Sequence, residues 1–258
     1  MGRVIFVSAG PGSADLITLR GLRALQQADV VLFDALTDPA LREFAPNARW
    51  LDVGKRGFSD STAQTAINAA LVREASQAAV VVRLKGGDAS IFGRLEEELL
   101  ALDEAGIDSE VVPGVTAAIA AAAQSRRPLT RRGQGRSVAL TTAMTREGDL
   151  QALKSADTEV FYMAGRQLGA LARKLPLAGW AAETPVMVVS RAGCADALSS
   201  EHTVATLAAA SLLHRGRPTV VTVGAGAAPV GHVKRSRAAR EQCPQLEPHQ
   251  ARPPITHD

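Results

Sequence analysis

Two patterns of apolar and polar positions alternate along the chain. Short apolar runs are followed by longer segments in which leucine, alanine or valine recurs every three or four residues. Continuous apolar runs predict buried strands, and the recurring pattern predicts helices with one apolar face. Strands are predicted at residues 4–8, 30–33, 49–53, 80–84 and 109–112, and helices at, for example, residues 62–75 and 94–105.

This alternation is typical of α/β proteins, and it predicts a parallel, doubly wound sheet for the first half of the chain. After Pro113-Gly114 comes an alanine-rich helix at residues 115–123, and strand patterns resume at 137–142, 158–163, 185–190 and 219–224. We therefore expect two α/β domains, residues 1–113 and 114–230, with a small-molecule site in the cleft between them.

Composition narrows the class of protein. The chain has 258 residues, 46% of them hydrophobic and 3% aromatic, as expected of α/β cores built from alanine, valine and leucine. The apolar run from Val111 to Ala123 falls short of the ~20 residues that a membrane span needs. Cys194 and Cys243 form neither a C-x-x-C motif nor a disulfide framework. With no signal-peptide pattern at the start, we predict a cytoplasmic protein without a metal site and without membrane partners.

The sequence pI of about 9.2 suggests a nucleic-acid partner, but the charge distribution argues against one. Residues 231–258 hold five basic and three acidic residues, hence +2 of the formal net charge of +3. This proline-rich segment predicts a disordered basic tail. Between Glu110 and Glu147 the chain has six arginines and no acidic residue. That excess suits an anionic small molecule.

Two predicted strands run into glycine turns. Gly10-Pro11-Gly12 follows the first strand, and Gly86-Gly87-Asp88 follows the strand at 80–84. Ligands of open α/β sheets bind at the carboxyl ends of strands, glycines allow close approach, and Asp88 adds a hydrogen-bond acceptor. An ordinary turn with Asp88 near a helix N-cap explains the second segment equally well.

The first turn is neither a phosphate loop nor a dinucleotide fingerprint. It lacks Gly-Lys-Ser/Thr and the third glycine of G-x-G-x-x-G. Pro11 also has no N–H to donate to a phosphate. The turn therefore predicts a closely packed ligand other than a diphosphate, which disfavours a nicotinamide oxidoreductase.

An ordered series of motifs resembles the tetrapyrrole methylases. It covers residues 4 to 224 and comprises Ser8-Ala-Gly-Pro-Gly12, Asp15-Leu-Ile-Thr-Leu-Arg-Gly-Leu-Arg-Ala-Leu25, Ala28-Asp-Val-Val-Leu-Phe-Asp34, Val53-Gly-Lys-Arg-Gly57, Arg83-Leu-Lys-Gly-Gly-Asp88, Ile91-Phe-Gly-Arg94 and Val112-Pro-Gly-Val-Thr-Ala117.

The resemblance implies a homodimer of two α/β domains, of the class III methyltransferase type, with S-adenosylmethionine in the cleft. Leu84-Lys-Gly-Gly-Asp88 with Ile91-Phe-Gly-Arg94 points to the member that methylates uroporphyrinogen III at C2 and C7, giving precorrin-1 and then precorrin-2. A pyrrole carbon attacks the sulfonium methyl in line, so positioning contributes much of the acceleration. A methylase of a later corrin precursor and a noncatalytic S-adenosylmethionine-binding relative are the alternatives.

The resemblance also implies which residues contact the cofactor. Taken alone, Ile91 and Met163 suit core residues better than cofactor contacts, and Thr116 suits a helix cap. The implied cofactor contacts are Pro11, Gly86, Gly87, Asp88, Ile91, Thr116, Ala117, Met163 and Gly193.

By the same resemblance, Asp34 is the implied proton acceptor and Lys55 the implied proton donor. A base suits the chemistry, because C-methylation leaves a cationic tetrapyrrole that must lose a proton. Asp34 capping the next helix, and Lys55 or Arg56 pairing with a substrate carboxylate, are the alternatives. Arginines are expected around a polycarboxylate tetrapyrrole. The candidates are Arg56, Arg94, Arg127, Arg131 and Arg132.

Some positions depart from the family pattern. Leu129-Thr-Arg-Arg132 stands where relatives commonly have Leu-Thr-His-Arg, and Thr142-Ala-Met144 where they have Thr-Gly-His. Ala-Ser follows Asp88 in place of Pro-Phe. The cofactor glycines are intact, so these departures concern the acceptor more than the fold or the cofactor.

Overall fold

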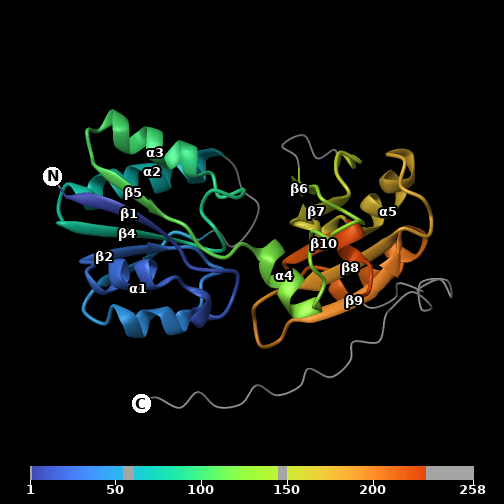
Figure 1. Cartoon of the computed structure of the whole chain (residues 1–258). Helices are drawn as coiled ribbons and strands as arrows, with labels where there is room; N and C mark the ends of the chain where they lie inside the picture. Colours follow the sequence, from blue (N-terminus) through green and yellow to red (C-terminus); the bar gives the residue numbers. More distant parts are fainter. Residues whose placement is uncertain (1, 55–60, 145–149, 231–258) are drawn as a thin grey trace, which may run out of the picture. The chain divides into compact units, whose positions relative to one another are not determined.

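The α/β class is confirmed by a computed structural model, which describes residues 2–54, 61–144 and 150–230. Residues Met1–Ala228 cluster as one compact unit. Within this unit the strands form two five-stranded sheets (Figure 1).

The first sheet is parallel throughout, as predicted. Its order is β3-β2-β4-β1-β5. Because β4 lies between β1 and β2, and β5 lies on the other side of β1, the strand order reverses beside β1. Ligands of doubly wound sheets bind at such a point, outside the carboxyl ends of the strands. The strands are β1 (Arg3–Ser8), β2 (Val30–Phe33), β3 (Arg49–Asp52), β4 (Val80–Lys85) and β5 (Ser109–Val112).

Helices cover both faces of this sheet (Figure 1). Successive residues of a strand face opposite sides, so Val7 packs toward α1 (Leu19–Gln26) and η2 (Pro39–Phe44). Phe6 packs toward α2 (Ser61–Ala75) and α3 (Leu95–Glu104). The predicted strands and helices of this half agree with the structure to within one residue at each end. The near-continuous apolar runs of β1 and β4 follow from burial on both faces.

The second sheet is mixed. Its order is β6-β7-β10-β8-β9, with β6 and β7 parallel and the other pairs antiparallel. The sequence did not predict β9, because its segment Leu-Ser-Ser-Glu-His-Thr is mostly polar. That composition suits an edge strand, which pairs only with β8. The strands are β6 (Val138–Thr142), β7 (Thr158–Tyr162), β8 (Pro185–Ser190), β9 (Leu198–Thr203) and β10 (Thr219–Gly224).

This second sheet also carries helices on both faces. On one face α4 (Ala117–Ser125) packs its buried alanines against Tyr162 and Val189. On the other, α5 (Leu168–Leu177) and η4 (Val204–Ala210) enclose Phe161 and Val221. The remaining helices are η1 (Ala14–Leu16), η3 (Ala164–Arg166), α6 (Ser211–His214) and η5 (Ala225–Ala227).

The two sheets fall on either side of residue 113, yet Met1–Ala228 cluster as one unit. The division into domains 1–113 and 114–230 therefore stays a prediction. The predicted tail, residues 231–258, lies outside the described residues. In the described part of the chain, no helix is both long and apolar enough to cross a membrane.

Candidate functional site

The two glycine turns lie against each other. The Gly10 N–H donates to the Gly87 carbonyl at 3.1 Å, and the Gly87 N–H donates to the Gly10 carbonyl at 2.7 Å. Both residues have positive φ, 85° and 70°, which favours glycine. A Cβ built on Gly87 meets nothing within 4 Å, so open space adjoins the turn. The parallel pairing of β1 and β4 thus brings the two predicted cofactor turns together at one edge.

Asp88 connects the second turn to the segment before α4. One carboxylate oxygen accepts from the Gly114 N–H at 2.8 Å, and the other from the Ser90 N–H at 2.9 Å and from the Ser90 hydroxyl. Burial opposes ionisation of Asp88, but these hydrogen bonds outweigh it and lower its pKa. Asp88 is therefore an ionised residue that bridges two loops. It is not a helix N-cap, since Arg94 holds that position in α3.

The first turn contacts Gly193 in the loop after β8. The Ser13 N–H donates to the Gly193 carbonyl at 3.0 Å. A Cβ on Gly193, whose φ is 84°, would lie 3.2 Å from Pro11 Cγ, and one on Gly12 would lie 2.6 Å from Cys194 Sγ. Two implied cofactor contacts, Pro11 and Gly193, are thus neighbours. Beside them is a cavity of about 500 Å³ whose walls include Leu16, Val115, Ile119 and Gly193.

Tyr162, at the end of β7, joins the start of α4. Its hydroxyl lies 2.8 Å from Thr116 Oγ1 and accepts from the Ala118 N–H at 3.3 Å. Burial raises the pKa of Tyr162, so it stays protonated. Thr116 occupies the N-cap position of α4, but its side chain makes no capping bond. The capping alternative for Thr116 is thus correct in position but not in its side-chain bond.

Tyr162 and Phe92 were not among the predicted site residues. The two rings meet edge to face, with centroids 5.1 Å apart. Ile91 and Ala117 pack against the core cluster that includes Tyr162. Phe92 belongs to the Ile-Phe-Gly-Arg motif, which could have indicated it. Tyr162 stands inside an ordinary apolar strand pattern and gave no signal.

Met163 has an unusual conformation for a core residue. It follows β7, has φ of 57° and is 43% exposed, so the core alternative for it is wrong. The left-handed region costs a non-glycine residue roughly 1–2 kcal/mol, and such strain collects at functional sites. Phe92 and Arg191 share this conformation, with φ of 54° and 50°.

Asp34 follows β2 at the carboxyl edge of the first sheet. Its carboxylate accepts from Arg83 Nη2 at 2.6 Å, and its side chain is 30% exposed. It does not cap the next helix, because Asp38 caps η2 by accepting from the Ala40 N–H at 3.0 Å. The capping alternative for Asp34 is wrong. Lys55 and Arg56 lie outside the described residues.

The partner of Asp34 belongs to a buried charged cluster that the sequence analysis missed. We call it the Arg83 cluster. Arg83 and Lys85 lie two residues apart on β4, so both side chains are on the face of the sheet that α3 covers. Both donate to the carboxylate of Glu98. The signal was present, because two basic residues interrupt an apolar strand at positions of the same parity. The cluster consists of Asp34, Arg83, Lys85 and Glu98.

The predicted substrate arginines lie in different surroundings. Arg94 is half-exposed and donates twice to the Glu97 carboxylate, at 2.7 and 2.6 Å. Arg127 is buried and bonds to the Ala227 carbonyl and to Glu201, which explains its burial without a ligand. The substrate role of Arg127 stays a prediction that nothing in the structure supports.

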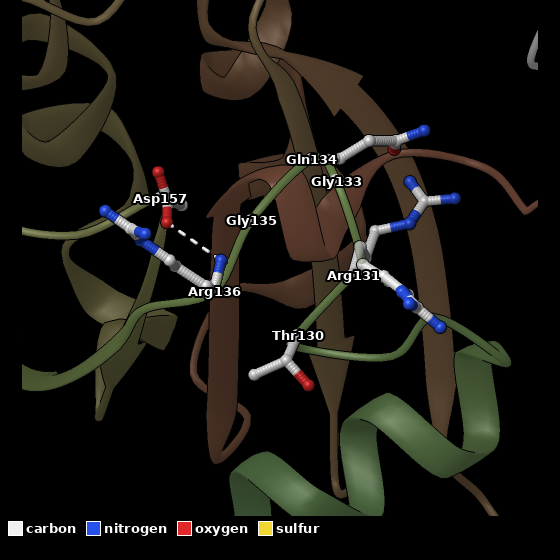
Figure 2. A pocket seen from close by; sticks show the side chains of 8 residues that line it. Thr130, Arg131, Gly133, Gln134, Gly135, Arg136 and Asp157 are labelled. Carbon is white, nitrogen blue, oxygen red and sulfur yellow. Dashed lines mark hydrogen bonds between the residues drawn. The ribbon is translucent and has the colours of Figure 1, made fainter.

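Arg131 and Arg132 line an open cavity of about 670 Å³ at the loop before β6. Arg131 Nη1 donates to the Ala225 and Ala228 carbonyls, at 3.3 and 3.1 Å, and Arg132 is exposed. Figure 2 shows Arg131 on one side of the loop and Arg136 on the other, where its N–H donates to Asp157 at 2.9 Å. None of the cavity's walls belongs to the implied cofactor set, so this cavity and the glycine turns are separate features.

Known proteins of similar sequence show the family of this chain. The sequence profile of the tetrapyrrole (corrin/porphyrin) methylases matches residues 3–208. The chain belongs to this family. It is 45% identical over 195 residues to a uroporphyrinogen-III C-methyltransferase of Pseudomonas aeruginosa, covering 74% of this chain and 80% of that protein.

Two further similar proteins extend the comparison. A siroheme synthase of Yersinia pseudotuberculosis is 42% identical over 225 residues, 85% of this chain, but the chain spans only 47% of that protein. The crystal structure of a uroporphyrin-III C-methyl transferase from Thermus thermophilus with S-adenosylhomocysteine superposes with a TM-score of 0.76. It is 34% identical, and the match covers 86% of this chain and 97% of that one.

Proposed function

We propose that the chain is an S-adenosylmethionine-dependent methyltransferase that methylates uroporphyrinogen III at C2 and C7, giving precorrin-1 and then precorrin-2. The observation that carries the proposal is the hydrogen-bonded pairing of Gly10 with Gly87 at the carboxyl ends of β1 and β4. It joins two turns that the family motifs assign to the cofactor, in a chain whose relatives are named for this reaction.

The residues present fit the cofactor. Open space adjoins Gly87, and the nearest atom to a Cβ on Gly86 is Leu36 Cβ at 3.6 Å, so the turn leaves room for a closely packed ligand. Gly86, Gly87 and Asp88 would form one wall, and Pro11 and Gly193 another. Ile91, Thr116, Ala117 and Met163 complete the proposed contacts. When bound, S-adenosylmethionine supplies the electrophilic methyl group.

Asp34 is the proposed proton acceptor. Its carboxylate is partly exposed, and Arg83 holds it at the sheet edge that bears the glycine turns. A base there removes the proton that the methylated pyrrole must lose. Lys55 as proton donor is a proposal from the family motifs, and Arg56, Arg94, Arg131 and Arg132 as partners of the substrate carboxylates are proposals from charge. Charge-assisted contacts of this kind suit a polycarboxylate.

We also propose that the protein acts as a homodimer in the cytoplasm. The family resemblance supports the dimer, and a sequence without a C-x-x-C motif or disulfide framework supports a reducing compartment. Light scattering on the purified chain tests the first proposal: a dimer mass supports it, and a monomer at micromolar concentration contradicts it.

Mass analysis of the tetrapyrrole tests the activity directly. Purified protein is incubated anaerobically with uroporphyrinogen III and S-adenosylmethionine, and S-adenosylhomocysteine binding is measured by calorimetry on the same sample. A gain of two methyl groups is expected. Cofactor binding without methylation of uroporphyrinogen III rejects this acceptor; turnover of a later corrin precursor then favours the related methylase, and no turnover favours a noncatalytic binding protein.

A further inference from the structure

The Arg83 cluster places several charges inside the protein. The side chains of Arg83, Lys85 and Glu98 are 2%, 4% and 1% exposed. Burying ions costs several kcal/mol each, and apolar residues of similar volume in their place are often equally stable. Stability alone therefore does not explain why a guanidinium, an ammonium and a carboxylate occupy this core position. Their location beneath the proposed active site suggests a second reason.

Solvent reaches the cluster at Asp34. Arg83 Nη2 donates to the Asp34 carboxylate at 2.6 Å and to Glu98 Oε1 at 3.2 Å, while Arg83 Nε donates to Glu98 Oε2 at 3.1 Å. The guanidinium is thus held on one side by a fully buried carboxylate and presents its other side to a partly exposed one. Nη1 adds bonds to the Leu32 and Leu84 carbonyls, at 3.5 and 3.3 Å, which anchor the guanidinium between β2 and β4.

Glu98 receives donors from two further side chains. Lys85 Nζ donates to Oε1 at 2.7 Å, and Gln64 Nε2 donates to the same oxygen at 3.2 Å. Both carboxylate oxygens of Glu98 therefore accept hydrogen bonds. If an amide N–H replaced either oxygen, it would face another donor. A glutamine at this position would lose part of its contact with Arg83 whichever way its amide pointed.

We propose that Glu98 is a positioning residue that acts through Arg83 to orient the Asp34 carboxylate for proton removal. The proposal rests on the proposed function, because it takes Asp34 as the base. A fixed base matters because displacement of a reacting group by about 1 Å can cost about 100-fold in rate. Arg83 donates to both Asp34 and Glu98, and Lys85 interacts with Asp34 only through charge among the described residues, so Arg83 is the hydrogen-bonded link between the two carboxylates.

A double-mutant cycle tests the link. We expect Glu98→Gln to lower kcat by tenfold or more, about the scale of a misplaced group, with the KM for S-adenosylmethionine and the S-adenosylhomocysteine Kd unchanged. Asp34→Asn should lower kcat about 10²–10⁴-fold, as loss of a general base does. In the Asp34→Asn background, Glu98→Gln should have almost no further effect, because the group that it positions is gone.

Two further variants separate positioning from folding. Gln64→Leu removes a neutral donor to Glu98 and keeps the bonds between Glu98 and Arg83, so its kcat should stay within about twofold of wild type even if its melting temperature falls. Arg83→Lys should recover part of the activity that Arg83→Met loses. A kcat for Glu98→Gln near that of wild type, or an undiminished Glu98→Gln effect in the Asp34→Asn background, overturns the inference.

Crystal structures judge the inference independently of turnover. If the wild-type chain methylates no tetrapyrrole, the proposed function fails. If Asp34→Asn is fully active, the proposed role of Asp34 fails. The position of the carboxylate is still measurable. We expect the contact between Asp34 and Arg83 to be lost in Glu98→Gln and kept in Gln64→Leu. An unmoved Asp34 carboxylate in Glu98→Gln refutes the positioning role.

Discussion

Each of the two sheets buries a polar cluster, and the clusters differ in charge. The Arg83 cluster of the first sheet is ionic and reaches solvent at Asp34. The second sheet buries a hydroxyl and imidazole cluster centred on His214, which we call the His214 cluster. Its bonds run from His214 Nδ1 to Ser190 Oγ at 2.5 Å and from His214 Nε2 to Ser200 Oγ at 2.8 Å.

The His214 cluster is internally satisfied. Ser190 Oγ also lies 2.9 Å from Thr219 Oγ1, whose hydroxyl donates to the Arg217 carbonyl at 2.8 Å, and Ser200 Oγ lies 2.8 Å from His202 Nε2. A neutral, satisfied network specifies packing at modest net free energy. A charged network with a partly exposed end can act on a ligand. The charges therefore favour the proposed role in chemistry for the Arg83 cluster and a structural role for the His214 cluster.

The largest predicted effect is a loss of stability when the Arg83 cluster is disrupted. Arg83→Met should lower the free energy of unfolding by about 3–5 kcal/mol, because it leaves the buried Glu98 carboxylate with only one cationic partner. Urea denaturation measures this loss. Arg3→Met on β1 is the control, since Arg3 is exposed and its change should stay within about 0.5 kcal/mol. Equal losses in the two variants would contradict the claim that removing Arg83 leaves a buried charge without enough compensation.

The next largest predicted effect is the pH dependence of stability that His214 causes. Burial, followed by the positive charges of His202 and Arg217, lowers the pKa of His214. Because the folded pKa lies below the unfolded value of about 6.5, the unfolded chain binds the extra proton first. The resulting stability is present above pH 6.5 and falls as the pH drops toward the folded pKa.

His214→Gln should weaken this pH dependence. The variant cannot take up a proton, so the slope of unfolding free energy against pH between about 6.5 and 5 should decrease. At pH 7.5 it should cost about 1–3 kcal/mol, because a buried hydroxyl loses its partner. Urea unfolding at pH 7.5 measures the cost, and urea unfolding between about pH 6.5 and 5 measures the slope. His202→Gln is the comparison, since the pKa of His202 is also lowered but its side chain is less enclosed. An unchanged slope in His214→Gln would refute the assignment.

The smallest effect is expected where the loop after β8 meets the first turn. Gly193→Ala places a Cβ 3.0 Å from Leu16 Cδ1 and 3.2 Å from Pro11 Cγ, at φ of 84°. The strain of about 1–2 kcal/mol should displace Pro11 and weaken S-adenosylhomocysteine binding about tenfold, measured by calorimetry. Gly106→Ala carries similar strain at φ of 66° with no neighbour within 4 Å. An unchanged Kd in Gly106→Ala and a raised one in Gly193→Ala support the proposed wall.

How far the sequence predicts this protein differs between the two halves. In the first, apolar runs alternate with helical patterns, and every predicted strand is present. In the second, the polar strand β9 (Leu198–Thr203) was missed, because an exposed edge needs few apolar residues. The antiparallel pairing of β7, β8 and β10 also follows from chain reversals that periodicity does not record.

For the candidate site, motif order indicated Pro11, Gly87, Thr116 and Met163, but not what surrounds them. The Tyr162 hydroxyl is visible only once β7 ends beside α4. Glu98 stands next to Glu96 and Glu97 in the chain, and only its place on the helix face with Leu102 buries it. The sequence does not predict the bonds from Arg83 and Lys85 to Glu98, because these residues meet only when α3 packs on β4.

The sequence by itself determined the alternation of strands and helices and the glycine turns, because these depend on local backbone freedom and on the period of apolar positions. The family follows from the same local motifs. Only the tertiary structure decided that Gly10 pairs with Gly87, that Asp34 meets Arg83, and that Arg127 is held inside the protein. Those contacts join residues far apart in the chain, and their energies depend on burial and geometry that exist only after the sheets have formed.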